Sequence, residues 1–406
     1  MSLLPVAEAL AKVVADVSML PSEEVPIEAT RGRILASAIT ALRTQPGFDA
    51  SAMDGYAVRA EDAQQGATLD LIGESAAGHG YAGRVGEKEA VRIFTGAPVP
   101  DGADAVVIQE NTRRDGNRVI VETAARLGQN IRGRGLDFTE GAEALTPGIV
   151  IGPRDIALAA AMNHPRLPVR RRPKVAILAT GDELVLPGQA VGQDQIVASN
   201  NFAIRALVEA EGGDVLDLGI ASDDFPALEA AIKRARTQKA DILVTIGGAS
   251  VGDHDLIQTA LTREGMTLGF WKIAMRPGKP LLHGRLGPMH ILGLPGNPVS
   301  SVVCGVLFLV PLLRTLLGRS DAALARRKAV FAAPWPANDL REDYIRARYS
   351  LDEASGIIKV APLAPQDSSL VSVLQQADCL VIRPPFAPAA AAGEACEIID
   401  LRQAGL

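Results

Sequence analysis

The 406-residue sequence is short of cysteine, histidine and aromatic side chains, and each shortage excludes a class of protein. Its three cysteines, Cys304, Cys379 and Cys396, lie far apart, so they fit neither a disulfide framework nor a zinc-binding motif. Aromatic residues make up only 4% of the chain and basic clusters are short, so we expect no nucleic-acid partner. The cysteine pattern indicates a reducing compartment, and we therefore expect a cytoplasmic protein.

The sequence also lacks segments that predict insertion into a membrane. The N-terminus has no basic region, so we expect no signal peptide. The longest apolar run, Val302 to Leu313, is interrupted by Gly305 and Pro311. It is shorter than the stretch of about 20 residues that a transmembrane helix needs. We therefore predict a buried helix in this run, and no membrane partner.

The remaining composition is that of a globular protein with several domains. Hydrophobic residues make up 48% of the chain and charged residues 22%, with a net charge of −6. The length allows about two to four domains. Helices are expected at 4–20, 32–40 and 153–162, and a linker at 165–173. The pattern predicts these units: 1–45 with 139–172, a β-rich domain at 46–138, an α/β domain at 173–320 and a small C-terminal β-barrel at 327–406.

The α/β region carries the clearest pattern of alternating strands and helices. Apolar runs at 175–179, 215–220 and 242–246 are separated by helical segments of about 12 residues, which predicts a doubly wound parallel sheet. Ligands bind such sheets at the carboxyl ends of the strands. The loops at 180–183, 222–224 and 247–255 all fall at that edge. We therefore expect the functional site there.

One loop at this edge combines glycines with carboxylates. The last of these strands runs into Gly247 and Gly248, and the loop closes on Asp253 and Asp255. Backbone N–H groups of a glycine-rich loop can converge on an anion. Carboxylates would repel that anion unless a divalent cation lay between them. A plain turn with solvated acids is the alternative.

Basic residues and a second loop follow along the same edge. The segment 270–280 contains Lys272, Arg276 and Lys279. In the segment 295–301, Asn297 is placed to cap a helix that has Pro298 at its first position. This helix start can bind an oxyanion or can simply begin a core helix. Acids and bases together favour a metal ion with a polyanionic ligand.

Several long motifs are spread along the chain: PGFDASAMDGYAVR, RIFTGAPVPDGADAVVIQE, ATGDEL, GGASVGDHD, RPGKP and GLPGNPVSS. Taken together, they resemble the molybdopterin molybdenumtransferases, the MoeA family that includes the gephyrin E-domain. The resemblance implies insertion of molybdenum from molybdate into adenylylated molybdopterin, with a divalent metal such as Mg²⁺ and release of AMP. It also implies a homodimer whose clefts combine domains of both subunits.

The resemblance also implies which residues form the site. The expected catalytic residues are Asp54, Thr95, Glu183, Asp224 and Asp255, and Glu183 and Asp255 are the expected metal ligands. The expected substrate-binding residues are Gly247, Gly248, Ser250, Gly252, Lys272, Arg276, Lys279, Pro295, Gly296, Asn297, Pro298, Ser300, Arg346 and Ser368. Taken alone, Thr95, Arg346 and Ser368 would each be read as ordinary turn or surface residues.

The chain departs from the family pattern at two places. Met275-Arg276 stands where the family often has lysine, and Val197-Ala198 replaces the usual Tyr-Asp. An arginine fork binds oxyanions differently from an ammonium group. A gephyrin-like scaffold and a molybdopterin adenylyltransferase-like activity remain alternatives, as does tungstate in place of molybdate. Further partners would be a molybdopterin adenylyltransferase and proteins that load molybdoenzymes.

Overall fold

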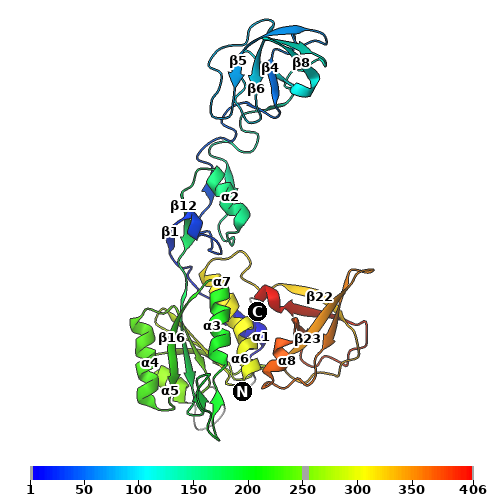
Figure 1. Ribbon diagram of the computed structural model, residues 1–406. Coiled ribbons are helices and arrows are strands. Elements are labelled where there is room, and N and C mark those ends of the chain that lie inside the picture. Colours follow the sequence, from blue (N-terminus) through cyan, green and yellow to red (C-terminus); the bar gives the residue numbers. More distant parts are fainter. Residues whose placement is uncertain (1–2, 249–255, 405–406) are drawn as a thin grey trace.

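The structure is a computed structural model that describes residues 3–248 and 256–404 (Figure 1). The molecule is elongated. A β-rich unit lies at one end, a narrow middle region follows, and a broad base holds an α/β sheet beside a β-barrel (Figure 1). The chain starts in the base, passes to the far unit and returns, and then forms the rest of the base (Figure 1).

The far unit is a six-stranded sheet in the order β7-β4-β6-β5-β9-β8. Its alternating side chains bury one apolar cluster on each face, with Tyr56 and Val58 on one side and Ala57 on the other. This confirms the β-rich region predicted from the short apolar runs. The strands are β4 (Gly55–Val58), β5 (Thr68–Ser75), β6 (Glu89–Ile93), β7 (Ala105–Ile108), β8 (Thr112–Asp115) and β9 (Arg118–Val121), with a 3₁₀ turn η2 (Gln109–Asn111).

The middle region pairs segments that lie far apart in the sequence. Its elements are β1 (Ser22–Pro26) with β12 (Arg166–Arg170), β2 (Ile39–Thr40) with β11 (Glu143–Leu145), β3 (Ala50–Ser51) with β10 (Ile131–Arg132), η1 (Ile27–Ala29) and α2 (Pro153–Ala161). The helix expected at 32–40 is wrong, because Ile34 and Leu35 instead form bridges to Val150 and Val169. The linker expected at 165–173 is likewise mostly strand.

The base contains a mixed sheet in the order β16-β13-β17-β21-β20-β18. The first four strands are parallel, which confirms the predicted parallel sheet. The strand β20 runs antiparallel to both of its neighbours, β21 and β18, and this antiparallel part was not expected. The strands are β13 (Lys174–Thr180), β16 (Asp214–Ala221), β17 (Ile242–Ile246), β18 (Thr267–Trp271), β20 (Leu282–Leu286) and β21 (Met289–Leu294).

Helices cover both faces of this sheet. Val175 and Ile177 of β13 belong to the apolar cluster under α1, α3, α6 and α7, and Ala176 and Leu178 belong to the cluster under α4 and α5. The central strands are therefore buried on both faces, as in a doubly wound fold. The helices are α1 (Val6–Val14), α3 (Asn200–Ala210), α4 (Phe225–Thr237), α5 (Leu256–Arg263), α6 (Pro298–Cys304) and α7 (Val310–Leu316).

The predicted buried helix is longer than its apolar run. Helical structure is continuous from Pro298 to Leu316 and includes a π-helical segment, η3 (Gly305–Leu309), just before Pro311. A π-turn is one way to fit a proline, which lacks an N–H group, into a helix. Within the described chain, this helix alone has the length and apolarity to cross a bilayer, but 94% of its apolar window is buried in the protein.

The C-terminal region forms a closed barrel, as predicted. Five strands follow the order β23-β24-β22-β26-β25, and β25 pairs again with β23. The short β19 (Met275–Arg276) joins β23 in parallel and ties the barrel to the α/β sheet. The remaining elements are β22 (Arg326–Phe331), β23 (Glu342–Asp352), β24 (Ile357–Pro362), α8 (Val371–Gln375), β25 (Cys379–Arg383), β26 (Ala395–Asp400) and η4 (Leu401–Ala404).

Two buried histidines lie on the antiparallel part of the sheet. The rings of His283 and His290 are 6.3 Å apart, and burial lowers their pKa values to about 4 and about 3. Arg285 donates a hydrogen bond to Nε2 of His290, which requires the neutral ring. Positive charge on Arg285 and Lys12 opposes protonation of His283 further.

These histidines make stability dependent on pH. In the unfolded chain they take up protons near pH 6.5, whereas in the folded chain they stay neutral to about pH 4. Folding stability should therefore fall as the pH drops from 6.5 toward 4, and His283 alone should contribute about 3 kcal/mol of that loss. Urea unfolding of wild type and His283→Leu across this range checks the slope; equal slopes would contradict the assignment.

Candidate functional site

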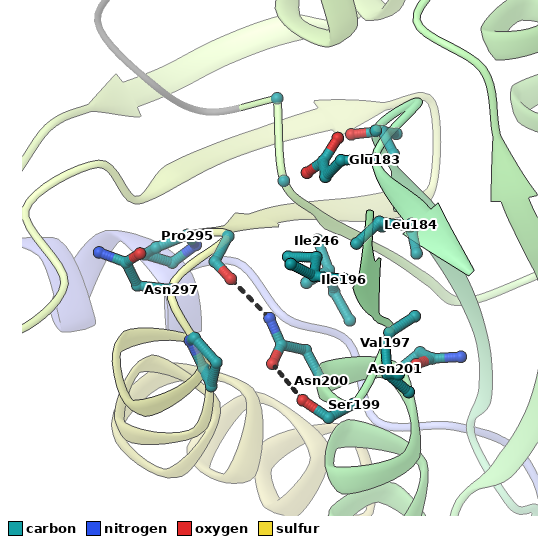
Figure 2. A pocket seen from close by; sticks show the side chains of 18 of the residues that line it. Glu183, Leu184, Ile196, Val197, Ser199, Asn200, Asn201, Ile246, Pro295 and Asn297 are labelled. Atoms are coloured by element: carbon teal, nitrogen blue, oxygen red, sulfur yellow. Dashed lines mark hydrogen bonds between the residues drawn. The ribbon is translucent and has the colours of Figure 1, made fainter. Parts of the chain in front are cut away.

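A cavity of about 540 Å³ opens at the carboxyl ends of β13 and β17 (Figure 2). The chain runs from β13 to β16 on one side of β13, and then from β16 to β17 on the other side. The cavity therefore lies at the point where the strand order reverses. Ligands bind doubly wound sheets at such a point. The cavity is lined by both strand ends, by the starts of α3 and α6, and by Ser369 of the barrel.

The glycine-rich loop supplies part of the cavity floor. Gly247 and Gly248 have φ angles of +95° and +63°, which favour glycine. A Cβ atom on Gly247 would lie 2.6 Å from the carbonyl oxygen of Thr180, so a larger residue does not fit. The predicted site residues Ser250, Gly252 and Asp255 lie outside the described residues.

Two acidic residues line the cavity. Glu183 is one of the predicted residues, and its carboxylate folds over Gly181, where a Cβ atom would lie 2.4 Å from Oε2. Asp223 is the other acidic residue in the lining. Its backbone N–H donates to Oδ1 of Asp182 over 3.2 Å. The loops after β13 and β16 therefore meet at the cavity, as their position in the sequence predicts.

Asp224 does not line the cavity and instead caps helix α4. Its Oδ1 accepts from the N–H of Ala227 over 2.8 Å, and its Oδ2 accepts from the Ser222 hydroxyl over 2.6 Å. The bond from Ser222, and then the bond from Ala227, lower the pKa of Asp224. Both carboxylate oxygens therefore accept hydrogen bonds from the protein itself, and the expected catalytic role of Asp224 stays a prediction.

The capping role predicts a stability effect. Asp224→Ala should lower Tm by about 1–3 °C, because the first turn of α4 loses its cap, whereas Asp224→Asn should keep most of the wild-type Tm. Calorimetric melting of the three proteins measures this. An unchanged Tm in Asp224→Ala would show that the cap contributes nothing.

One wall of the cavity is aliphatic, and the sequence did not predict it. The short strands β14 (Leu184–Val185) and β15 (Ile196–Val197) pair in parallel beside the opening. Ile196 and Val197 are 57% and 43% exposed, and both line the cavity together with Leu184 (Figure 2). Such a wall suits a flat ring system. The replacement of the usual Tyr-Asp by Val197-Ala198 was the feature of the sequence that could have indicated this apolar wall.

The start of helix α6 closes the opposite wall. Pro295, Gly296, Asn297 and Pro298 line the cavity, as predicted, and the Asn200 side chain donates to the Gly296 carbonyl over 2.7 Å (Figure 2). Ser300 is only 4% exposed and does not line it, contrary to expectation. Its place one turn into the helix directs it into the core.

Asn297 connects this wall to the barrel. Its side chain makes no capping bond to α6 and instead donates to the Ser368 hydroxyl over 3.0 Å. The N–H of Val299 donates to the Ser368 carbonyl, also over 3.0 Å. The predicted residue Ser368 therefore holds the barrel against the cavity, and its neighbour Ser369 lines it.

A second cavity, of about 220 Å³, lies on the barrel side and is lined by three arginines, Arg276, Arg346 and Arg383. Arg346 is 1% exposed and donates to the Asp367 carbonyl over 3.1 Å. The Nε groups of Arg346 and Arg383 have no hydrogen-bond partner among the described residues. Buried donors of this kind are usually paired, so the cavity is suited to an anion.

The three basic residues predicted for the site, Lys272, Arg276 and Lys279, do not line one common cavity among these two. Arg276 forms ion pairs with Asp343 over 2.5 Å and Asp339 over 3.2 Å, and the bond to Asp343 raises the pKa of Arg276. The Lys272 ammonium lies 3.6 Å from the centre of the Trp271 ring. Neither Lys272 nor Lys279 lines either of these two cavities.

Asp54 and Thr95 form a tight pair far from the cavity. Asp54 Oδ1 accepts from the Thr95 N–H over 2.7 Å and from its hydroxyl over 2.8 Å, and the N–H bond is the main cause of the lowered pKa of Asp54. The pair lies on the sheet that contains β4 and β6, at the opposite end of the molecule (Figure 1). One chain therefore does not bring it to the cavity.

The electrostatics of the 540 Å³ cavity are unusual for an anion site. No lysine or arginine lines it in the part of the chain that the structure describes. Within the same residues, no group of three or more His, Cys, Asp or Glu side chains is placed to hold a metal ion by itself. An anionic ligand would thus depend on N–H and O–H donors, on a cation that it shares with Glu183, or on both.

Family models match the chain in three consecutive parts. The MoeA N-terminal region (domain I and II) matches residues 4–163, the probable molybdopterin binding domain matches residues 176–315, and the MoeA C-terminal region (domain IV) matches residues 328–401. The 540 Å³ cavity lies mainly in the second of these parts.

Curated and solved proteins resemble the chain over most of its length. The molybdopterin molybdenumtransferase of Haemophilus influenzae is 36% identical, with 89% of each chain covered. That of Bacillus subtilis is 33% identical, with 98% of this chain and 94% of the relative covered. Two MoeA crystal structures from Pyrococcus horikoshii align with TM-scores of 0.86 and 0.82 at 31% and 28% identity, covering 98% of this chain and 99% and 100% of theirs.

Proposed function

The chain belongs to the MoeA family, and from this premise we propose that it is a molybdenum insertase of molybdenum cofactor biosynthesis. It transfers molybdenum from molybdate to adenylylated molybdopterin and releases AMP. The observation that carries the proposal is the cavity at the strand switch point, which lies in the region that matches a probable molybdopterin binding domain. The match over nearly the whole chain does not favour a scaffold or an adenylyltransferase.

The shape of the cavity supports a substrate with a ring and a phosphate. The aliphatic wall of Leu184, Ile196 and Val197 offers an apolar surface to a flat ring. On the opposite side, Gly247 and Gly248 line the cavity without side chains, so a phosphate could approach the backbone there. The substrate would therefore lie across the ends of β13 and β17.

A magnesium ion fits the carboxylate that faces this phosphate. Glu183 has the oxygen ligand that Mg²⁺ prefers, and Mg²⁺ is usually held by one or two carboxylates together with substrate phosphates. When bound, the ion would offset phosphate charge and polarise the bond to adenylate. Asp255 remains the second expected ligand. Glu183 itself would fix the position of the ion at the cavity edge.

The arginine-lined cavity supports binding of molybdate, which is a dianion. Arg346 and Arg383 offer unpaired Nε donors there, and arginine forks suit oxyanions. Arg276 would act less directly, because Asp343 and Asp339 already neutralise it. Gln366 lines the arginine-lined cavity and Ser369 lines the 540 Å³ cavity, so the short segment between them would connect the molybdate site with the pterin site.

The remote Asp54–Thr95 pair supports a homodimer. A second copy could bring this pair to the cavity of the first, which a single chain does not do. Its carboxylate, held ionised by two bonds from Thr95, would then orient the reacting centre. We further propose that this dimer acts in the cytoplasm and receives its substrate from a molybdopterin adenylyltransferase.

The function is tested by AMP release from adenylylated molybdopterin with molybdate and Mg²⁺ added or withheld. We expect release to require both ions. Glu183→Gln should lower the rate at least about 100-fold and abolish the response to Mg²⁺, because one metal ligand is lost. Glu229→Gln, a change at a half-buried position of α4 that does not line the cavity, should leave the rate unchanged and serves as the control.

Two outcomes would contradict the proposal. Tight binding of adenylylated molybdopterin by the wild type without AMP release would indicate a carrier or scaffold. Wild-type turnover in Glu183→Gln, with the same dependence on Mg²⁺, would remove Glu183 from the metal site.

A further inference from the structure

One buried hydroxyl at the wall of the 540 Å³ cavity makes no hydrogen bond with the described residues. Thr180 is the last residue of β13 and is only 4% exposed, yet it lines the 540 Å³ cavity. Its Oγ1 has no hydrogen-bond partner among the residues that the structure describes. A buried hydroxyl without a partner is destabilising, so its presence at the cavity wall points to a bond made with a ligand.

The surroundings of this hydroxyl indicate what the ligand group is. A Cβ atom on either Gly247 or Gly248 would lie 3.1 Å from Oγ1, so the hydroxyl lies directly against these two glycines, which also line the cavity. The hydroxyl therefore lies beside a part of the cavity wall that carries no side chains. Because no lysine or arginine lines this cavity in the described chain, a neutral donor such as this hydroxyl can supply a direct contact from the protein to an anionic group.

We infer that Thr180 contacts the substrate directly, and that its hydroxyl donates a hydrogen bond to a phosphate oxygen of the adenylylated pterin. This inference rests on the proposed function. Thr180 lies in the ATGDEL motif, but it was not among the substrate-binding residues expected from the sequence. Its role is to hold the phosphate at the glycine loop while Glu183 remains free to face a cation.

The chain offers a matched control in the neighbouring strand. Thr245 of β17 is 0% exposed, and its Oγ1 likewise has no partner in the described part of the chain. It does not line the cavity. The change from threonine to valine removes the hydroxyl at nearly constant volume, so the two positions differ in their access to a ligand and not in the chemistry of the substitution.

The experiment measures binding of AMP and of adenosine by calorimetry, with Mg²⁺ present, to wild type, Thr180→Val, Thr180→Ser and Thr245→Val. Thr180→Val should weaken AMP binding about 10- to 100-fold, since a bond to a charged group is lost. Adenosine, which lacks the phosphate, should bind Thr180→Val within about 2-fold of wild type. Thr180→Ser and Thr245→Val should bind both ligands like the wild type.

Thermal unfolding separates a binding role from a structural one. Because Oγ1 has no partner in the protein, Thr180→Val should melt at or above the wild-type temperature. Unchanged AMP binding in Thr180→Val would overturn the inference, and an equal loss of adenosine affinity would overturn the assignment to the phosphate. If Thr180→Val does not fold, Thr180→Ala removes the same hydroxyl and is measured in its place.

Failure of the inference is distinguishable from failure of the proposed function. Wild type that releases AMP with molybdate, together with a Thr180→Val variant of unchanged AMP affinity, would contradict only the role of Thr180. Wild type that neither binds nor releases AMP would contradict the proposed function and the inference with it.

Discussion

The parallel pairing of β13 with β16 on one side and β17 on the other is the constraint on which the site depends. This pairing places three strand ends at one edge and sends the following loops in opposite directions. Both faces of β13 are buried under helices, so the strand end at Thr180 and Gly181 is rigid. The cavity, the glycine loop and Glu183 all follow from that arrangement.

The sequence predicted this part of the fold because its signals are local. Continuous apolar runs such as Ile242–Ile246 indicate buried strands whatever lies beside them. The helix expected at 32–40 failed for the opposite reason. Leu35 and Ile39 are spaced like neighbours on a helix, but both are buried by contacts with residues more than a hundred positions away, and those contacts override the local pattern.

The site residues, too, were predicted well where the signal is local and poorly where it depends on distant contacts. Loops directly after strands, with Gly247 and Glu183, were correctly placed at the cavity. Asp224, which was expected to be catalytic, caps a helix, and an acid just before a proline-led helix also fits a cap. Pairs such as Asn297 with Ser368 join distant segments. Such pairs depend on how the barrel docks, which no local pattern encodes.

We propose that the reacting centre is shared between two copies, because Asp54 and Thr95 lie in the far β-rich unit and not at the cavity of their own chain. The most direct measurement mixes two inactive proteins, Asp54→Asn and Glu183→Gln, and follows molybdate-dependent AMP release after the subunits exchange. A mixed dimer keeps one intact site, so an equal mixture should regain about a quarter of wild-type activity. A mixture that stays inactive, although mixed dimers have formed, would contradict the shared site.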